Sequence, residues 1–209
     1  MNMNNSRNEP LPLTLPVARA DSRRRQVTGL KLADAAVLAF NCDLQGVNEH
    51  APAVDADQIS SLARWLQALP AKTAEATIGL RLARAESLRR MLDDPDWSLP
   101  AHVAQSGRRL LDYIRRIDDL IPDDLPLIGH LDDALLVELS WSEFAGEVQD
   151  YLDYCRFRSE VRFRGTAEER RTLWESACLA EANAIIHRLQ VRERGYARTE
   201  PLSRPLRVC

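Results

Sequence analysis

The sequence lacks a long apolar run. Its longest stretch without Asp, Glu, Lys or Arg is 97–107, whereas a membrane-spanning helix needs about 20 predominantly apolar residues. Residues 1–25 also lack a charged start followed by an apolar block, which a secretory signal would have. We therefore predict no transmembrane span and a cytoplasmic location.

Sequence motifs of known catalytic and cofactor sites are also missing. The four cysteines form no CxxC pair, which argues against a zinc knuckle. The four histidines stand apart, and no HExxH, GxSxG, Walker or GxGxxG pattern occurs. The sequence consequently identifies no catalytic residue and predicts no cofactor. Whether the protein is an enzyme stays open at this stage, and a non-enzymatic role is the one we favour.

Lysine is scarce as well, since it occurs only at 31 and 72 among 28 basic residues. We interpret this bias toward arginine as the mark of a GC-rich, bacterial genome. The basic run at 23–25 has no interleaved aromatic residues, as a single-strand-binding surface would have. Nucleic acid is therefore not the expected partner.

Charge is unevenly distributed along the chain. The net charge of −3 conceals an acidic block over 112–153, in which 12 acids accompany only two arginines. Residues 154–209 carry an excess of arginine. Because neighbouring carboxylates repel one another, we predict that the acidic block lies against arginines of the last helix and its entry. These are Arg162, Arg164, Arg170, Arg171 and Arg188.

The secondary-structure pattern predicts an all-α protein. Leu- and Ala-rich segments between prolines favour helix, and no alternating strand pattern of useful length occurs. We predict a compact bundle of about six helices, with N-caps at Asp55, Thr73 and Ser98 and a capping box from Thr166 to Glu169. The predicted helices are 30–41, 55–69, 73–93, 99–118, 131–158 and 166–193.

The domain boundaries follow from the same periodicity. Residues 1–26 have no helical period and are predicted to be a disordered tail. A single helical domain covers 27–196, and 197–209 form a loose basic tail. In the sixth helix, the spacing predicts an inward-facing stripe. Its members are Leu173, Ala177, Ala180, Ala184 and Leu189.

An unusual segment separates the fourth and fifth predicted helices. Pro122 and Pro126 disfavour helix at the residues before them, and Gly129 permits a sharp turn. The intervening Leu and Ile residues are too apolar for a solvated loop. We therefore predict a Pro/Gly elbow that packs against the bundle and leads into a helix whose first turn carries Asp132 and Asp133.

The elbow resembles the YkvA-like family, a bacterial domain of unknown function. The resemblance rests on an Asp-Leu-Ile-Pro-Asp run, a hydrophobic-Pro pair, a glycine and a closing Asp-Asp. It implies a small helical domain and supplies no activity. The matching positions are 119–123, 125–126, Gly129 and 132–133.

The aspartates of the elbow have two interpretations. The one we favour is structural: Asp132 and Asp133 cap the fifth helix, where carboxylates meet free N–H groups. The alternative is a divalent-metal site for Mg²⁺, Mn²⁺ or Ca²⁺, which prefer hard oxygen ligands. Its ligands would be Asp119, Asp123, Asp132 and Asp133. We take His130 as a structural or surface residue of the elbow.

These observations predict a non-enzymatic helical interaction or regulatory protein of unknown pathway. Its expected partner is another protein, and the oligomeric state stays open. The alternative is a divalent-metal-dependent enzyme, hydrolase-like, that uses the aspartates of the elbow. Stoichiometric binding of a divalent ion distinguishes the two.

Overall fold

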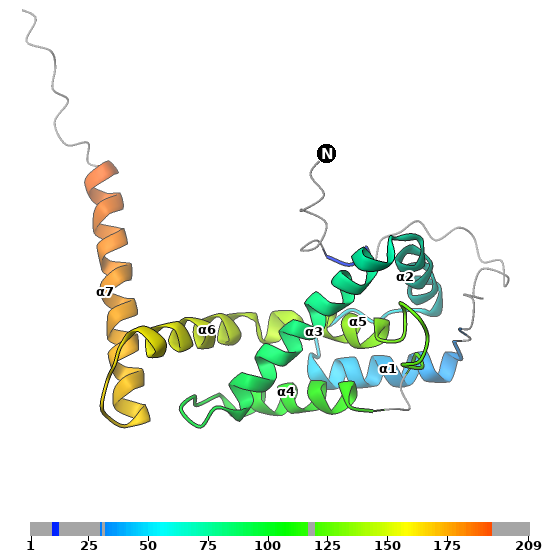
Figure 1. Ribbon diagram of the computed structural model, residues 1–209, viewed down its shortest axis with the longest axis horizontal. Coiled ribbons are helices and arrows are strands. Elements are labelled where there is room, and N and C mark those ends of the chain that lie inside the picture. The colour runs from blue at the N-terminus through cyan, green and yellow to red at the C-terminus, as the bar shows by residue number, and fades with distance from the viewer. Residues whose placement is uncertain (1–9, 13–29, 31, 117–119, 194–209) are drawn as a thin grey trace, which may run out of the picture. The chain divides into compact units, whose positions relative to one another are not determined.

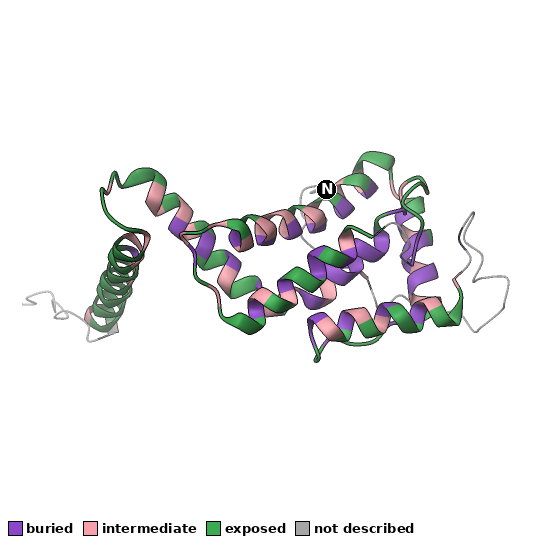
Figure 2. Ribbon diagram, turned by 90° about the horizontal axis from the view of Figure 1, so that it is seen from below, coloured by how far each residue is buried: buried purple, intermediate pink, exposed green. Residues whose placement is uncertain are grey.

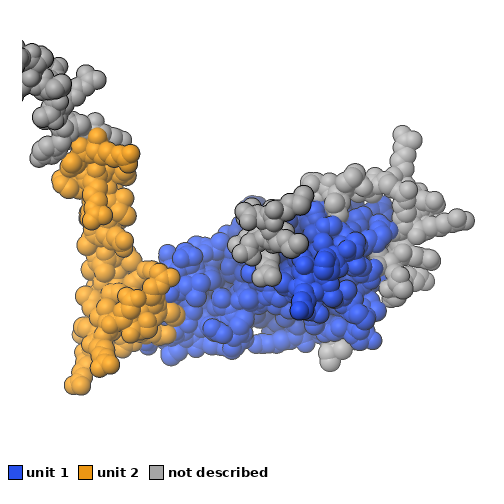
Figure 3. Space-filling view, turned by 45° about the horizontal axis from the view of Figure 1, so that its top comes forward, with its two compact units in different colours: residues 1–152 blue, residues 153–209 orange. Residues whose placement is uncertain are grey.

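The computed structural model describes residues 10–12, 30, 32–116 and 120–193 (Figure 1). Within this part the chain forms seven α-helices, a 3-10 turn and loops, without a β-strand, which confirms the all-α prediction. The predicted 197–209 tail and Asp119 lie outside the described residues. Of the predicted tail 1–26 only 10–12 are described, and there Leu11 is buried. The chain divides into two units, 1–152 and 153–209 (Figure 3).

The first unit has its core where five helices meet. Helix α3 packs against α4 and α5, and α1 packs against the same two helices. The buried faces of these helices turn toward one another (Figure 2). The helices are α1 (Asp34–Val47), α2 (Ala56–Ala68), α3 (Ala71–Asp93), α4 (Ala101–Ile114) and α5 (Leu131–Ser140). The largest fully buried apolar side chains include Phe40, Leu44, Ile59, Leu62, Leu66, Leu88, Met91, Leu110 and Ile121.

The helix starts confirm one predicted cap in this unit and correct two. Asp55 caps α2 in a reciprocal box with Gln58, with hydrogen bonds of 2.8 and 2.9 Å. Helices α3 and α4 instead begin directly after Pro70 and Pro100, without a side-chain cap. Proline has the backbone φ that a helix start requires. The predicted cap Thr73 therefore lies inside the first turn of α3.

Ser98 is likewise not a cap, because Pro100 stands between it and the first residue of α4.

The predicted fifth helix over 131–158 is wrong as a single element. The structure breaks it into α5, a 3-10 turn η2 (Trp141–Glu143) and α6 (Ala145–Glu160). At the break, the hydroxyl of Ser140 donates to the carbonyl of Leu136 at 2.7 Å. Such a bond from a serine to the preceding turn competes with the backbone ladder and bends helices.

A buried ion pair joins α3 to α5. The guanidinium of Arg81, 1% exposed, lies 3.1 Å from Oε2 of Glu138, and Arg84 reaches the same oxygen at 3.0 Å. Arg81 also donates to the carbonyl of Thr77. Burying a charge is costly unless it is paired and hydrogen-bonded. Glu138 of the acidic block is thus neutralised from α3, whereas the prediction had assigned this role to the arginines of the last helix.

The second unit holds the end of α6 and the long α7 (Ala167–Glu193). The predicted capping box is confirmed. The backbone N–H of Thr166 donates to the carboxylate of Glu169 at 2.8 Å, and the backbone N–H of Glu169 donates to the hydroxyl of Thr166 at 3.2 Å. Trp174 is buried edge-on against Tyr154, and its indole N–H donates to Asp153 at 3.0 Å. Asp153, the last acid of the acidic block, thus has a partner within this unit.

The predicted inward stripe of α7 is wrong. All five of its members are exposed, and they are Leu173, Ala177, Ala180, Ala184 and Leu189. Within this unit α7 meets α6 through Trp174 and Cys178, which lie on a different side of the helix from the first four of these residues. The physical reason is the short length of its partner: only Asp153–Glu160 of α6 belong to this unit.

Candidate functional site: the elbow and the exposed face of α7

Residues 120–130, which we call the elbow, contribute part of their apolar side chains to the core of the first unit. Leu120, Ile121 and Ile128 are buried, whereas Leu125 and Leu127 are half-buried. Its backbone closes on itself through two turns, in which Leu125 N–H donates to Pro122 O at 3.1 Å and Gly129 N–H to Leu125 O at 2.9 Å. The elbow is therefore a folded element rather than a solvated loop.

Gly129 is required by a close backbone approach. A Cβ atom at this position would overlap the backbone carbonyl of Asp123. The left-handed backbone of the elbow occurs instead at Leu127, whose φ is 68°, an unusual conformation for a residue with a branched side chain. Because residue 129 has no side chain, the backbone at Asp123 can lie against the start of α5.

Asp132 fastens the elbow to α4 and α5. Its Oδ2 accepts the phenol proton of Tyr113 at 2.9 Å and the backbone N–H groups of Leu120 and Ile121 at 3.1 and 3.2 Å. The side chain is fully buried, and burial raises the pKa of Asp132 above its ordinary value. The opposing effect of the three hydrogen bonds is smaller.

The prediction that Asp132 caps α5 is therefore wrong, because its carboxylate binds other groups. The N-cap residue is His130, which makes no side-chain cap bond, and the N–H groups that Asp132 holds belong to the elbow. The sequence correctly placed the carboxylate in the first turn. It did not show that this carboxylate would face the preceding segment.

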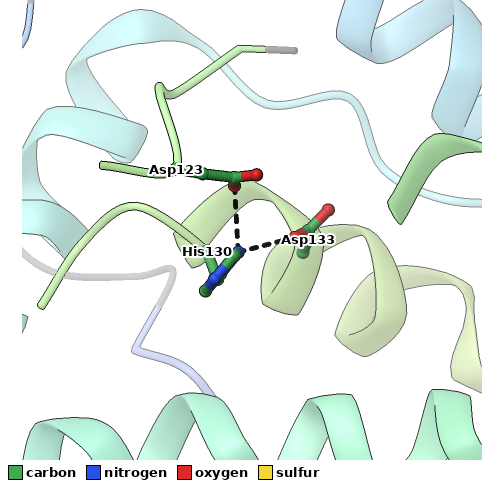
Figure 4. Close-up of side chains that lie close together, drawn as sticks. All are labelled: Asp123, His130 and Asp133. Atoms are coloured by element: carbon green, nitrogen blue, oxygen red, sulfur yellow. Dashed lines mark hydrogen bonds and ion pairs between the residues drawn. The ribbon is translucent and has the colours of Figure 1, made fainter. Parts of the chain in front are cut away.

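Asp123, His130 and Asp133 converge at the start of α5 (Figure 4). The Nδ1 atom of His130 lies 3.0 Å from Oδ1 of Asp123 and 3.2 Å from Oδ2 of Asp133. One potential ligand atom from each of the three residues lies within 4.8 Å of the others. Two carboxylates and an imidazole thus meet from the elbow and from α5. We call these three residues the Asp–His–Asp cluster.

The structure brings together only some of the predicted metal ligands and adds another residue. Asp123 and Asp133 come together as predicted, while Asp132 turns into the core and Asp119 is not described. Adjacent helical residues point about 100° apart, and here the Oδ2 atom of Asp132 contacts Tyr113 whereas that of Asp133 contacts His130. His130 joins the cluster. The signal for it was its spacing of three residues from Asp133 across the first turn of a helix.

A cleft of about 420 Å³ opens beside the cluster. Asp123 and His130 line it from the elbow, and Ile78 and Leu82 line it from α3. Glu75 of α3 contributes a further carboxylate to the lining. An apolar cleft with a few polar groups at one end has the character of a small-molecule site.

A second candidate surface lies on α7. Five large apolar side chains of this helix are exposed, and at 100° per residue four of them fall on one side, next to Trp174 and Cys178. We call these four the α7 face: Leu179, Ile185, Ile186 and Leu189, exposed by 64, 48, 51 and 53%. The α7 face therefore extends the packed side of the helix beyond the residues that α6 covers.

Comparisons with protein-family models, with curated proteins and with solved structures give no match. The resemblance of the elbow to the YkvA-like family stays a prediction from its motif. Within the described helices, none combines the length and the apolar character that crossing a membrane requires.

Proposed function

We propose that this protein is a helical interaction module that binds another protein through the α7 face. The observation that carries the proposal is the exposure of four large aliphatic side chains on one side of a single helix. Contiguous exposed apolar surface marks interaction sites in folded proteins. In this proposal the protein is not itself an enzyme, and the first unit is the folded body that carries the interacting helix.

The spacing of the α7 face suits recognition of a partner groove or helix. Leu179 and Ile186 are seven residues apart, and Ile185 and Leu189 four. Spacings of four and seven residues are those at which an amphipathic helix presents its anchors to a hydrophobic groove. The expected partner surface is therefore an elongated apolar groove about three helical turns long.

Charged side chains beside the α7 face supply specificity. Glu181, Arg188 and Arg192 lie along one edge of the face at 100° per residue, and all three are exposed. Charges at the rim of an interface govern partner choice and association rate more than affinity. A partner groove bordered by both acidic and basic residues fits this edge.

Site-specific photo-crosslinking tests the proposal. A photoreactive amino acid at position 186 is expected to give one adduct of defined mass in the native host. The matched control places the same group at position 187, which is exposed but points about 100° away. The mass of the adduct separates a second copy of this chain from a different protein. No adduct at 186, or the same adduct at both positions, would contradict the proposal.

A further inference from the structure

We propose that the Asp–His–Asp cluster binds one divalent first-row transition ion, of the Mn²⁺ or Zn²⁺ type. Asp123 Oδ1, His130 Nδ1 and Asp133 Oδ2 would be its three protein ligands. This site differs from the four-aspartate set predicted from the sequence, because it contains a nitrogen ligand and excludes Asp132. It belongs to the first unit and the α7 face to the second, and the two share no residue, so the metal site does not depend on the proposed interaction.

The first argument is the shape of the cluster. Both carboxylates approach the same ring nitrogen, at 3.0 and 3.2 Å. A ring nitrogen carries at most one hydrogen, so a simple ion pair gives only one of the two carboxylates a direct hydrogen bond. An ion bound at about 2.0–2.2 Å from each ligand atom has octahedral ligand-to-ligand edges of about 3 Å. The two nitrogen–oxygen separations match those edges, and the two carboxylate oxygens lie within 4.8 Å of each other.

The second argument is the burial of Asp133. Its side chain is only 3% exposed, and it points at the ring nitrogen of His130. A buried carboxylate is tolerated when it is paired or coordinates a metal. Asp133 is fixed on the first turn of α5, where the N-terminal end of the helix favours a negative charge. It therefore serves as the rigid ligand of the set.

The third argument is access from solvent. Asp123 and His130 are 42 and 48% exposed, and both line the cleft of about 420 Å³. Three protein ligands leave further coordination positions, which would face the cleft and take water or a ligand. Sites of this composition, with a closed protein side and an open side, are typical of metal ions that bind small molecules.

The donor atoms select the class of ion. Imidazole nitrogen suits Zn²⁺ and other transition ions, whereas Mg²⁺ and Ca²⁺ prefer sites made of oxygen alone. Ca²⁺ in addition takes six to eight oxygen ligands, and this cluster supplies at most two carboxylates.

Titration of the chelator-stripped protein with Mn²⁺, followed by the electron paramagnetic resonance signal of the free ion, tests the site. Mn²⁺ is the chosen probe because it prefers oxygen and nitrogen ligands, which keeps free cysteines out of the result. We expect one bound Mn²⁺ per chain. The replacements Asp123→Asn and His130→Ala are each expected to weaken binding at least tenfold. Zn²⁺ should displace the bound Mn²⁺, and equimolar Ca²⁺ should not.

Matched controls make the test independent of folding. Asp124→Asn removes the neighbouring exposed acid, and His102→Ala removes an exposed histidine of α4; both should bind Mn²⁺ like the wild type. Asp133→Asn is used only if its helical circular dichroism and melting temperature match those of the wild type. Equal binding by the wild type and the cluster variants, or no stoichiometric binding by the wild type, would overturn the proposal. The cluster would then be a histidine ring held between two carboxylates without a metal ion.

Discussion

Helices α5 and α7 show opposite relations between apolar sequence and burial. Eight of the 10 residues of α5 are buried, and these include the charged Asp132 and Asp133. Among the side chains of α7 whose burial is described, Trp174 is the only buried one, although the helix runs for 27 residues and carries several Leu and Ile residues. Figure 2 shows this contrast as a mostly purple helix and a mostly green one.

The difference shows that neighbours, more than composition, decide whether a helix is buried. Helix α5 is enclosed by α1, α3 and α4, so even its polar side chains Asp132, Asp133 and Ser140 are buried. Helix α7 has the end of α6 as its neighbour within its unit. Its apolar side chains therefore remain available for a partner. Stability is expected to depend on α5 and recognition on α7.

The largest expected effect comes from breaking the buried ion pair of α5. Glu138→Gln leaves the guanidinium of Arg81 buried without its counter-charge, and the loss should be about 3–5 kcal/mol of unfolding free energy. The matched change in α7 is Glu175→Gln, whose partner Arg171 is 30% exposed. This change should cost about 0–1 kcal/mol. Urea unfolding measures both, and equal losses would remove the contrast between the two helices.

Asp132 should give the next largest effect. Asp132→Ala leaves the hydroxyl of Tyr113 and the N–H groups of Leu120 and Ile121 without their acceptor. Because buried donors are costly to leave unpaired, we expect a loss of about 2–4 kcal/mol. Asp132→Asn keeps one oxygen acceptor and should be milder. Thermal and urea unfolding compare the two variants; if Asn is as harmful as Ala, the negative charge itself is what the elbow requires.

Gly129 tests the close approach inside the elbow. Gly129→Ala places a Cβ atom against the backbone of Asp123, and we expect a loss of about 1–3 kcal/mol from overpacking. The control is Gly79→Ala in α3, where nothing lies within 4 Å of the added atom. Alanine favours a helix interior over glycine, so this control should gain about 0.5–1 kcal/mol. Denaturant unfolding measures both variants. The prediction is contradicted if both substitutions change the free energy of unfolding in the same direction.

The raised pKa of Asp132 predicts a smaller, pH-dependent effect. Because burial raises this pKa above 3.8 in the folded protein, the folded state binds the proton more tightly than the unfolded state. The resulting stabilisation is fully present below the unfolded pKa and is lost as the pH rises through the folded pKa. The destabilisation caused by Asp132→Asn should therefore be larger near pH 4 than near pH 7. Urea unfolding at several pH values measures it, and the opposite trend would mean a lowered pKa.

The smallest expected effect on stability lies in the α7 face. Replacing Ile185 and Ile186 by Gln should change the free energy of unfolding by less than about 0.5 kcal/mol for each residue, since both are about half exposed. The same double variant should lose the crosslinked partner adduct. A large drop in melting temperature would mean that the α7 face is packed inside the folded chain in solution.

Local chemistry allowed the sequence to predict much of the helical framework. The sequence predicted the cap at Asp55 from its residue type at a helix start, and the capping box at Thr166 from Glu169 three positions later. The elbow was found because prolines and a glycine interrupt two apolar segments. The predicted caps at Thr73 and Ser98 are wrong because Pro70 and Pro100 occupy the N-cap positions of α3 and α4.

The candidate site was predicted only in part, because its residues converge through packing. The sequence supplied Asp123 and Asp133 as candidates, but it did not separate Asp133 from Asp132. That separation depends on the rotation of α5 against α4, where Tyr113 and the N–H groups of the elbow take the Asp132 carboxylate. His130 lies close to Asp123 because Gly129, which has no side chain, lets the backbone of Asp123 lie against the residue before His130.

The sequence by itself determined the helical class, most of the element positions and the acidic, proline-rich elbow, since these follow from backbone preference and short-range hydrogen bonds. Only the tertiary structure decided which apolar faces are covered. A periodic stripe has the same pattern whether it meets a neighbour, as in α2, or remains exposed, as in α7. The physical reason is that burial depends on distant segments, and their approach is set by packing across the whole chain.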